Sequence, residues 1–171
     1  METDPRVMDL SIACVTSVKN ATGMELDLTQ DTLPVLDHYA TMIESSREEV
    51  IGLLAPMCGA YFGELVRRHL GLGQWDGLDG AYEDWRLELA PTSLSFNPLG
   101  VALEVMLQAE ASGWAAHLDV APSDRKKVDE ALAVYGAVRE EDFFRFTVRF
   151  EGVEQAVQTL LNNPGGMGPH P

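Results

Sequence analysis

The chain has 171 residues, enough for one compact domain with a sizeable core and short for two. Apolar residues make up 46% and charged residues 23%, a globular composition that excludes a disordered chain. The 27 acidic and 12 basic residues give a formal net charge of −15. Such an excess argues against binding to nucleic acid or to an anionic membrane, since both need clustered Lys and Arg. It is compatible with a basic protein partner, a cation or solubility alone.

The sequence favours a cytoplasmic protein. Residues 1–5 are acidic and lack the basic and apolar regions of a secretory signal. The apolar stretch 50–70 contains Pro56, three glycines and charged residues, which argues against a membrane span. Cys14 and Cys58 lie in apolar helical patterns without a CxxC spacing, so we expect free, buried thiols. One disulfide between them is the open alternative.

Three helical patterns occupy residues 4–71. Asp4-Pro5, an N-cap followed by proline, and the stop at Gly23 bound the first helix. After a short extended piece at 24–28, Asp31-Thr32 precedes a second helix that runs to Ile43. Ser45 or Ser46 is expected to cap a third helix that ends at Gly71.

The third helix carries a stripe of small residues surrounded by large apolar ones, which predicts a central, mostly buried helix. The stripe consists of Gly52, Ala55, Gly59, Ala60 and Gly63. It permits close approach of another backbone, within the chain or in a homo-oligomer, so the chain is expected to be a monomer or a homodimer. Pro56 is expected to kink or divide this helix.

The remaining chain mixes strands and helices. We expect a loop at 71–80, a hairpin of strands 85–89 and 94–96, a helix from Asn97-Pro98 to near Gly113, a third strand at 114–120 and a helix from 122 to 136. Residues 143–150 fit both strand alternation and helical spacing; their aromatic and β-branched residues favour a strand, followed by a helix to 161. The tail 162–171 is predicted to be disordered.

This order of elements predicts an α+β fold with an antiparallel or mixed sheet of about four strands, backed by five to six helices. We expect a single domain over residues 1–161, with a helical part at 4–71 and a sheet-containing part at 72–161.

No catalytic, metal-binding or cofactor motif is recognisable, and we expect no cofactor. The chain lacks GxGxxG, the phosphate-loop pattern, GxSxG and HExxH. The loop 76–84 carries four carboxylates, which fit either a solvated acidic turn or a bound cation without the EF-hand spacing. His117 and Asp119 share a face of the predicted third strand, which alternation alone explains. Arg125-Lys126-Lys127 with Arg145 and Arg149 could form a basic spot or solvated ion pairs.

One candidate pocket centres on Glu64, the acid inside the most apolar helix. A buried carboxyl of this kind can serve as a general acid or base. The alternative is an intrahelical ion pair, because Arg67 and Arg68 follow at three and four residues. The candidate pocket residues are Tyr61, Glu64, Arg67, Arg68, Trp75 and Trp85.

The negative charge concentrates in residues 71–120, which hold eight acidic residues and one basic residue, a net charge of −7. The residues that would form a partner-binding surface are Asp76, Asp79, Glu83, Asp84 and Glu88. We therefore expect a non-enzymatic interaction domain of the inhibitor or immunity type that masks a basic protein partner, because opposite fields speed association. A small-ligand or enzymatic pocket near Glu64 is the alternative.

The chain also resembles small uncharacterised bacterial proteins in which a helix reading A-Y-x-G-E-x-x-R precedes a tryptophan-bearing hairpin. The residues that carry the likeness are Ala60 to Arg68, Trp75, Phe96-Asn97-Pro98-Leu99, Glu25 to Leu28 and Thr32 to Asp37. The resemblance spans about residues 20–110 and its motifs are structural. It implies a bacterial cytosolic domain and supplies no catalytic residues.

Overall fold

The computed structural model describes residues 2–43, 47–133 and 140–162. Its helices are α1 (Pro5–Thr22), η1 (Gln30–Thr32), α2 (Leu33–Ile43), α3 (Glu48–Leu70), η2 (Tyr82–Asp84), α4 (Pro98–Leu107), α5 (Pro122–Ala133), α6 (Glu140–Phe143) and α7 (Phe146–Asn162). Its strands are β1 (Gln74–Asp76), β2 (Arg86–Glu88) and β3 (Ser95–Phe96). The fold is α+β, and helices dominate it.

The helix-capping predictions are confirmed for α1 and α4. The Asp4 side chain accepts a hydrogen bond from the Arg6 backbone N–H, and Gly23 closes α1 in the left-handed conformation. Asn97 is fully buried, and its side-chain oxygen accepts from the Leu99 N–H at 3.0 Å. α4 ends at Leu107 rather than near Gly113, because Gln108 adopts the left-handed conformation.

The predicted central helix, α3, runs without interruption through Pro56, so of the two expected effects, a kink or a division, the division is wrong. It begins after Arg47, and Ser45 and Ser46 lie outside the described residues. A Cβ on Gly59 would lie 2.4 Å from the Leu99 Cα, and one on Gly63 would lie 2.5 Å from the Trp75 ring. This part of the glycine stripe therefore packs α4 and β1 within the chain and is not free for a second copy.

The sheet has three antiparallel strands in the described residues, in the order β1-β2-β3, instead of about four. The predicted hairpin is confirmed by β2 and β3, with Leu87 opposite Phe96. β1 lies inside the segment that was expected to be a loop, with Trp75 opposite Leu87.

The strand predicted at 114–120 is wrong. One bridge joins Asp119 to Ser95, and Ala115 has a φ of 48°, so the segment follows β3 as an irregular chain.

Residues 143 and 146–150 are helical and 144–145 form a bend between them, so the favoured strand is also wrong. α6 ends at Phe143 and α7 begins at Phe146. The Asp37 carboxylate on α2 caps the new helix by accepting hydrogen bonds from the Phe146 N–H at 2.5 Å and the Thr147 hydroxyl at 2.7 Å. Of the predicted tail, Asn162 ends α7 and residues 163–171 lie outside the described residues.

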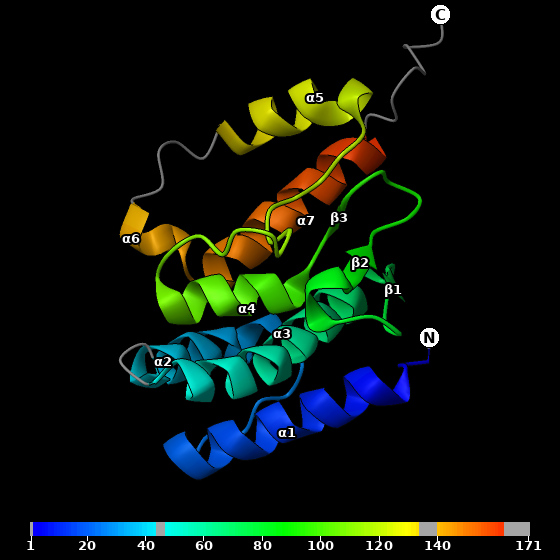
Figure 1. Ribbon diagram of the computed structural model, residues 1–171. Helices are drawn as coiled ribbons and strands as arrows, with labels where there is room; N and C mark the ends of the chain where they lie inside the picture. Colours follow the sequence, from blue (N-terminus) through cyan, green and yellow to red (C-terminus); the bar gives the residue numbers. More distant parts are fainter. Residues whose placement is uncertain (1, 44–46, 134–139, 163–171) are drawn as a thin grey trace, which may run out of the picture.

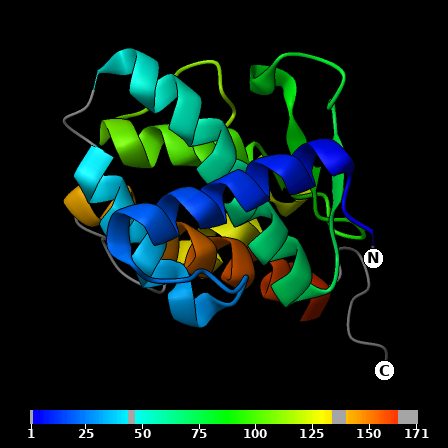
Figure 2. The same cartoon turned by 90° about the horizontal axis from the view of Figure 1, so that it is seen from below.

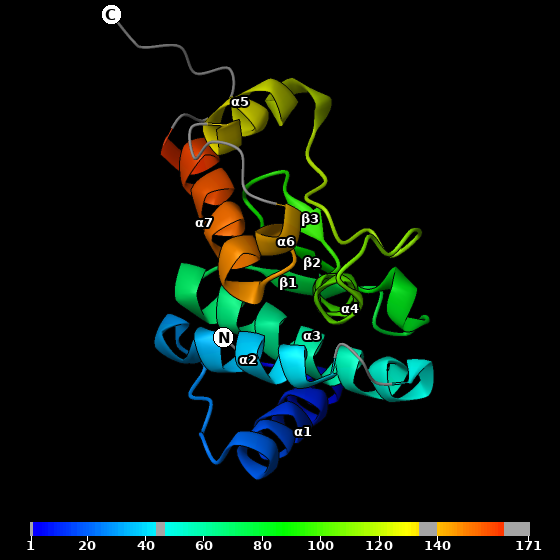
Figure 3. The ribbon, with the colours of Figure 1, turned by 90° about the vertical axis from the view of Figure 1, so that its left-hand side faces the viewer.

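The elements form a stack. Figure 1 shows α1 on one side, α3 and α4 in the middle, and α7 and α5 on the other side. Seen from below, α1 lies across α3 (Figure 2), and the side view gives the same order of layers (Figure 3). The most extensive helix contacts are those of α3 with α4 and with α1. One buried cluster contains side chains from α1, α2, α3, α4, α5 and α7, and from the sheet.

The two cysteines lie in this core. Cys14 on α1 and Cys58 on α3 are buried and free, and their sulfur atoms are 3.7 Å apart. The contact with Cys58, together with burial, raises the pKa of the Cys14 thiol well above its ordinary value. A thiol in this setting stays protonated and is a poor nucleophile.

Candidate functional site

The Glu64 side chain, at the centre of the predicted pocket, is 2% exposed and has partners on both carboxylate oxygens. Oε1 accepts from Arg67 Nε at 3.1 Å and from Trp75 Nε1 at 2.9 Å. Oε2 accepts from the Thr3 hydroxyl at 2.9 Å and lies 3.5 Å from Arg68 Nε. The carboxylate therefore joins α3, β1 and the segment before α1.

Arg67 completes this cluster and is itself 4% exposed. Its Nη2 donates to the Glu2 carbonyl at 3.0 Å and to the Thr3 hydroxyl at 3.1 Å. Because acid and base satisfy each other's hydrogen bonds, the arrangement fits the structural role of a buried ion pair. The intrahelical ion pair that the sequence offered as the alternative for Glu64 is confirmed, and it forms with both Arg67 and Arg68.

The predicted aromatic residues divide between two places. Trp75 and Trp85 meet edge to face, with ring centroids 6.1 Å apart, beside the Glu64 cluster. The Tyr61 hydroxyl instead accepts from the Leu28 N–H at 2.9 Å, and burial raises its pKa. The structure therefore brings five of the six candidate pocket residues together and leaves Tyr61 out.

The five predicted partner-surface residues are all exposed: Asp76, Asp79, Glu83, Asp84 and Glu88. We call this group the acidic face; it lies on β1, η2, β2 and the loop between β1 and η2. Arg6 Nη1 lies 2.7 Å from the Asp79 carboxylate, the one ion pair of this group in the described part of the chain. Asp76 and Glu88 lie on the paired strands β1 and β2, where Asp76 is opposite Arg86 and Glu88 is opposite Gln74.

A glycine turn holds the acidic face together. Gly77 has a φ of +76°, and a Cβ there would lie 2.3 Å from the Asp84 carbonyl oxygen. Only glycine combines this conformation with such a close approach. The loop that carries Asp79 therefore packs closely against the end of η2.

Sequence reasoning missed a second buried ion pair. Glu104 on α4 is 1% exposed and accepts from Arg149 Nη1 on α7 at 2.9 Å. Arg149 Nη2 donates to the Ala116 carbonyl at 3.1 Å. Burial lowers the pKa of the Arg149 guanidinium, and the Glu104 carboxylate opposes that shift. Arg149 therefore lies inside the protein and not in the expected basic spot, and Glu104 contributes no charge to the acidic surface.

His117 and Phe143 extend this second cluster to the surface. The imidazole stacks on Phe143 with a centroid distance of 5.7 Å, and His117 Nε2 lies 3.5 Å from Glu104 Oε2. The Arg149 guanidinium lies 4.5 Å from the centre of the same phenyl ring. Glu104 and Arg149 are 45 residues apart in the sequence and lie on different helices. No local spacing in the sequence could therefore predict that they pair.

In the described residues, no group of three or more His, Cys, Asp or Glu side chains is placed to hold a metal ion. One helix in this part of the chain, α3, has the length and composition to cross a membrane, and 67% of its apolar window is buried inside the protein.

No protein-family model, curated protein or solved structure matches the chain.

Proposed function

We propose that this chain is a non-enzymatic, cytoplasmic interaction domain, of the inhibitor or immunity type, that binds a basic protein through its acidic face. The observation that carries the proposal is the exposure of all five carboxylates on one small sheet and its connecting loop. A surface with an excess of one charge sign attracts an oppositely charged partner and speeds its association.

The packing of the supporting layer favours this proposal. Trp75 and Trp85 lie beneath the acidic face and pack against each other, and Trp75 is hydrogen-bonded to the buried Glu64. A surface that is already ordered loses little conformational freedom when it binds. Both carboxylate oxygens of Glu64 already have partners, which favours a structural role for Glu64 over a role as general acid or base.

Affinity capture from a lysate at low and high salt tests the proposal. We expect the wild type to capture a basic protein at about 50 mM salt and to lose it at about 500 mM, where screening is strong. The variant Asp76→Asn/Glu83→Gln/Glu88→Gln should lose the same partner. The matched control Asp9→Asn/Glu25→Gln/Asp31→Asn removes equal charge from exposed positions elsewhere and should retain it. Capture of no basic protein, or equal loss in both variants, contradicts the proposal.

A further inference from the structure

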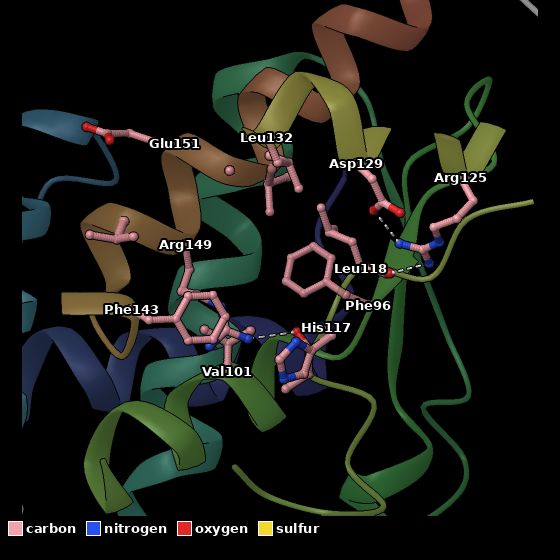
Figure 4. Close-up of a pocket in the computed structure, with 14 residues that line it drawn as sticks. Phe96, Val101, His117, Leu118, Arg125, Asp129, Leu132, Phe143, Arg149 and Glu151 are labelled. Atoms are coloured by element: carbon pink, nitrogen blue, oxygen red, sulfur yellow. Dashed lines mark hydrogen bonds and ion pairs between the residues drawn. The ribbon is translucent and has the colours of Figure 1, made fainter. Parts of the chain in front are cut away.

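A cavity of about 490 Å³ lies away from the acidic face, between α5, α7, α4 and the chain at 116–118. Figure 4 shows Phe96, Leu118 and Leu132 pointing into this space, with Phe143 and His117 side by side along another part of its wall. Most of the lining is aliphatic or aromatic. Volume and lining are typical of sites that enclose a small organic molecule.

A helical glycine keeps one wall of the cavity open. Gly152 lies in the middle of α7, where glycine costs about 1 kcal/mol relative to alanine. A Cβ at this position would meet only Leu132 Cδ2, at 4.0 Å, so close packing does not require the glycine. The missing side chain leaves space in the wall that faces α5.

Three of the four Arg, Asp and Glu side chains of the lining are paired, and the fourth, Glu151, is exposed and points away from the cavity in Figure 4. Arg149 is bound to Glu104, and Arg125 lies 3.5 Å from Asp129 and donates to the Leu118 carbonyl at 3.0 Å. Figure 4 shows Arg125 and Asp129 facing each other beside the cavity. A charged ligand would have to be desolvated without a free counter-ion, which is costly.

Arg149 and His117 bring hydrogen-bond donor groups to the wall. Arg149 lines the cavity, and its guanidinium has five N–H groups, of which two are engaged by Glu104 and Ala116. The His117 ring adds an imidazole next to the Phe143 face. Aromatic rings prefer to stack on, or pack edge to face with, other aromatic rings.

We propose that this cavity binds an uncharged aromatic molecule of about two rings that carries a hydrogen-bond acceptor such as a carbonyl. Its rings pack among Phe96, Phe143 and the aliphatic wall, and its acceptor faces Arg149 and His117. The site is distinct from the acidic face, so ligand binding and partner capture are tested separately.

Ligand-observed NMR titration with naphthalene-2-carboxamide tests the site. We expect saturable binding to the wild type. Naphthalene-2-carboxylate and 2-naphthylmethylammonium, with the same rings and a charge of either sign, should bind about tenfold more weakly or worse. No saturation by the amide, or equal affinity for a charged probe, overturns the proposal.

Variants at Gly152 locate the binding. Gly152→Leu places a side chain in the cavity and should weaken amide binding about tenfold or more, whereas Gly152→Ala should keep it within about twofold. Val148→Phe fills the same wall one turn earlier and serves if Gly152→Leu fails to fold, as checked by circular dichroism. Undiminished binding in the folded bulky variant overturns the proposal.

Discussion

Glu64 and Arg67 are buried at the same point, so each depends on the other for compensation of its charge. Glu64→Gln leaves the Arg67 guanidinium buried without a carboxylate and Arg68 with one fewer counter-charge. We expect a loss of about 3–5 kcal/mol in the free energy of unfolding, measured by urea denaturation. The control Glu88→Gln, at an exposed position, should change it by less than about 0.5 kcal/mol. Equal effects would show that Glu64 is not a structural carboxylate.

At the residue level, the sequence could predict the ion pair within α3 but not its burial with the N-terminal segment. The spacing of Glu64, Arg67 and Arg68 along one helix is visible in the sequence. The contribution of Thr3 comes from 61 residues away. Long-range partners of this kind have no local pattern, and the same is true of Glu104 with Arg149.

At the level of the elements, two of the three glycines of α3 have opposite surroundings. A Cβ on Gly59 would lie 2.4 Å from the Leu99 backbone, whereas Gly52 has nothing within 4 Å. Gly59→Ala must push α4 away and should destabilise the protein by about 1–3 kcal/mol. Gly52→Ala should stabilise it by up to about 1 kcal/mol through helix propensity. Thermal unfolding of the two variants measures both changes in stability. An unchanged stability of Gly59→Ala would contradict the close contact.

The helices were more predictable than the strands, and the reason is physical. The caps of α1 and α4 are made by adjacent residues, so Asp4-Pro5 and Asn97-Pro98 mark their starts in the sequence. Alternation at 85–89 predicted β2, but β1 has three residues, too few to show a period within a glycine-rich segment. At 143–150 both periods fit, and the outcome depends on a cap supplied by Asp37, 109 residues before Phe146.

The cap of α7 also predicts a pH dependence. Burial raises the pKa of Asp37 above its ordinary value of 3.8, although hydrogen bonds from α7 oppose the shift. The folded state therefore holds this proton more tightly than the unfolded state. The resulting stabilisation is full below about pH 3.8 and is lost as pH rises through the raised pKa.

The comparison of wild type with Asp37→Asn isolates this effect, because the variant carries no charge at that position. The free energy of unfolding of the wild type, minus that of the variant, should fall as pH increases above 3.8 and then level off. Urea denaturation at a series of pH values measures it. A difference that grows with pH would mean that the hydrogen bonds from α7 outweigh burial.

Over the whole molecule, the exposure of the acidic face was predictable from its alternating and loop-forming sequence. Its extent was not. Glu104 counts toward the net charge of −7 in residues 71–120, yet it is buried and neutralised by Arg149. The surface charge is therefore more concentrated on the β1–β2 unit and the loop that joins its strands than the sequence indicates.

This concentration predicts how salt affects stability. A net charge of −15 repels itself, and the Debye length falls from about 30 Å at 0.01 M salt to about 3 Å at 1 M. We expect the melting temperature to rise with sodium chloride. The rise should be smaller in Asp76→Asn/Glu83→Gln/Glu88→Gln than in Asp9→Asn/Glu25→Gln/Asp31→Asn, because both variants lose three charges but only the first removes neighbouring ones. Chloride is used because sulfate also strengthens apolar burial. Identical rises in the two variants would show that the repulsion is spread over the whole surface and that the acidic face is not its centre.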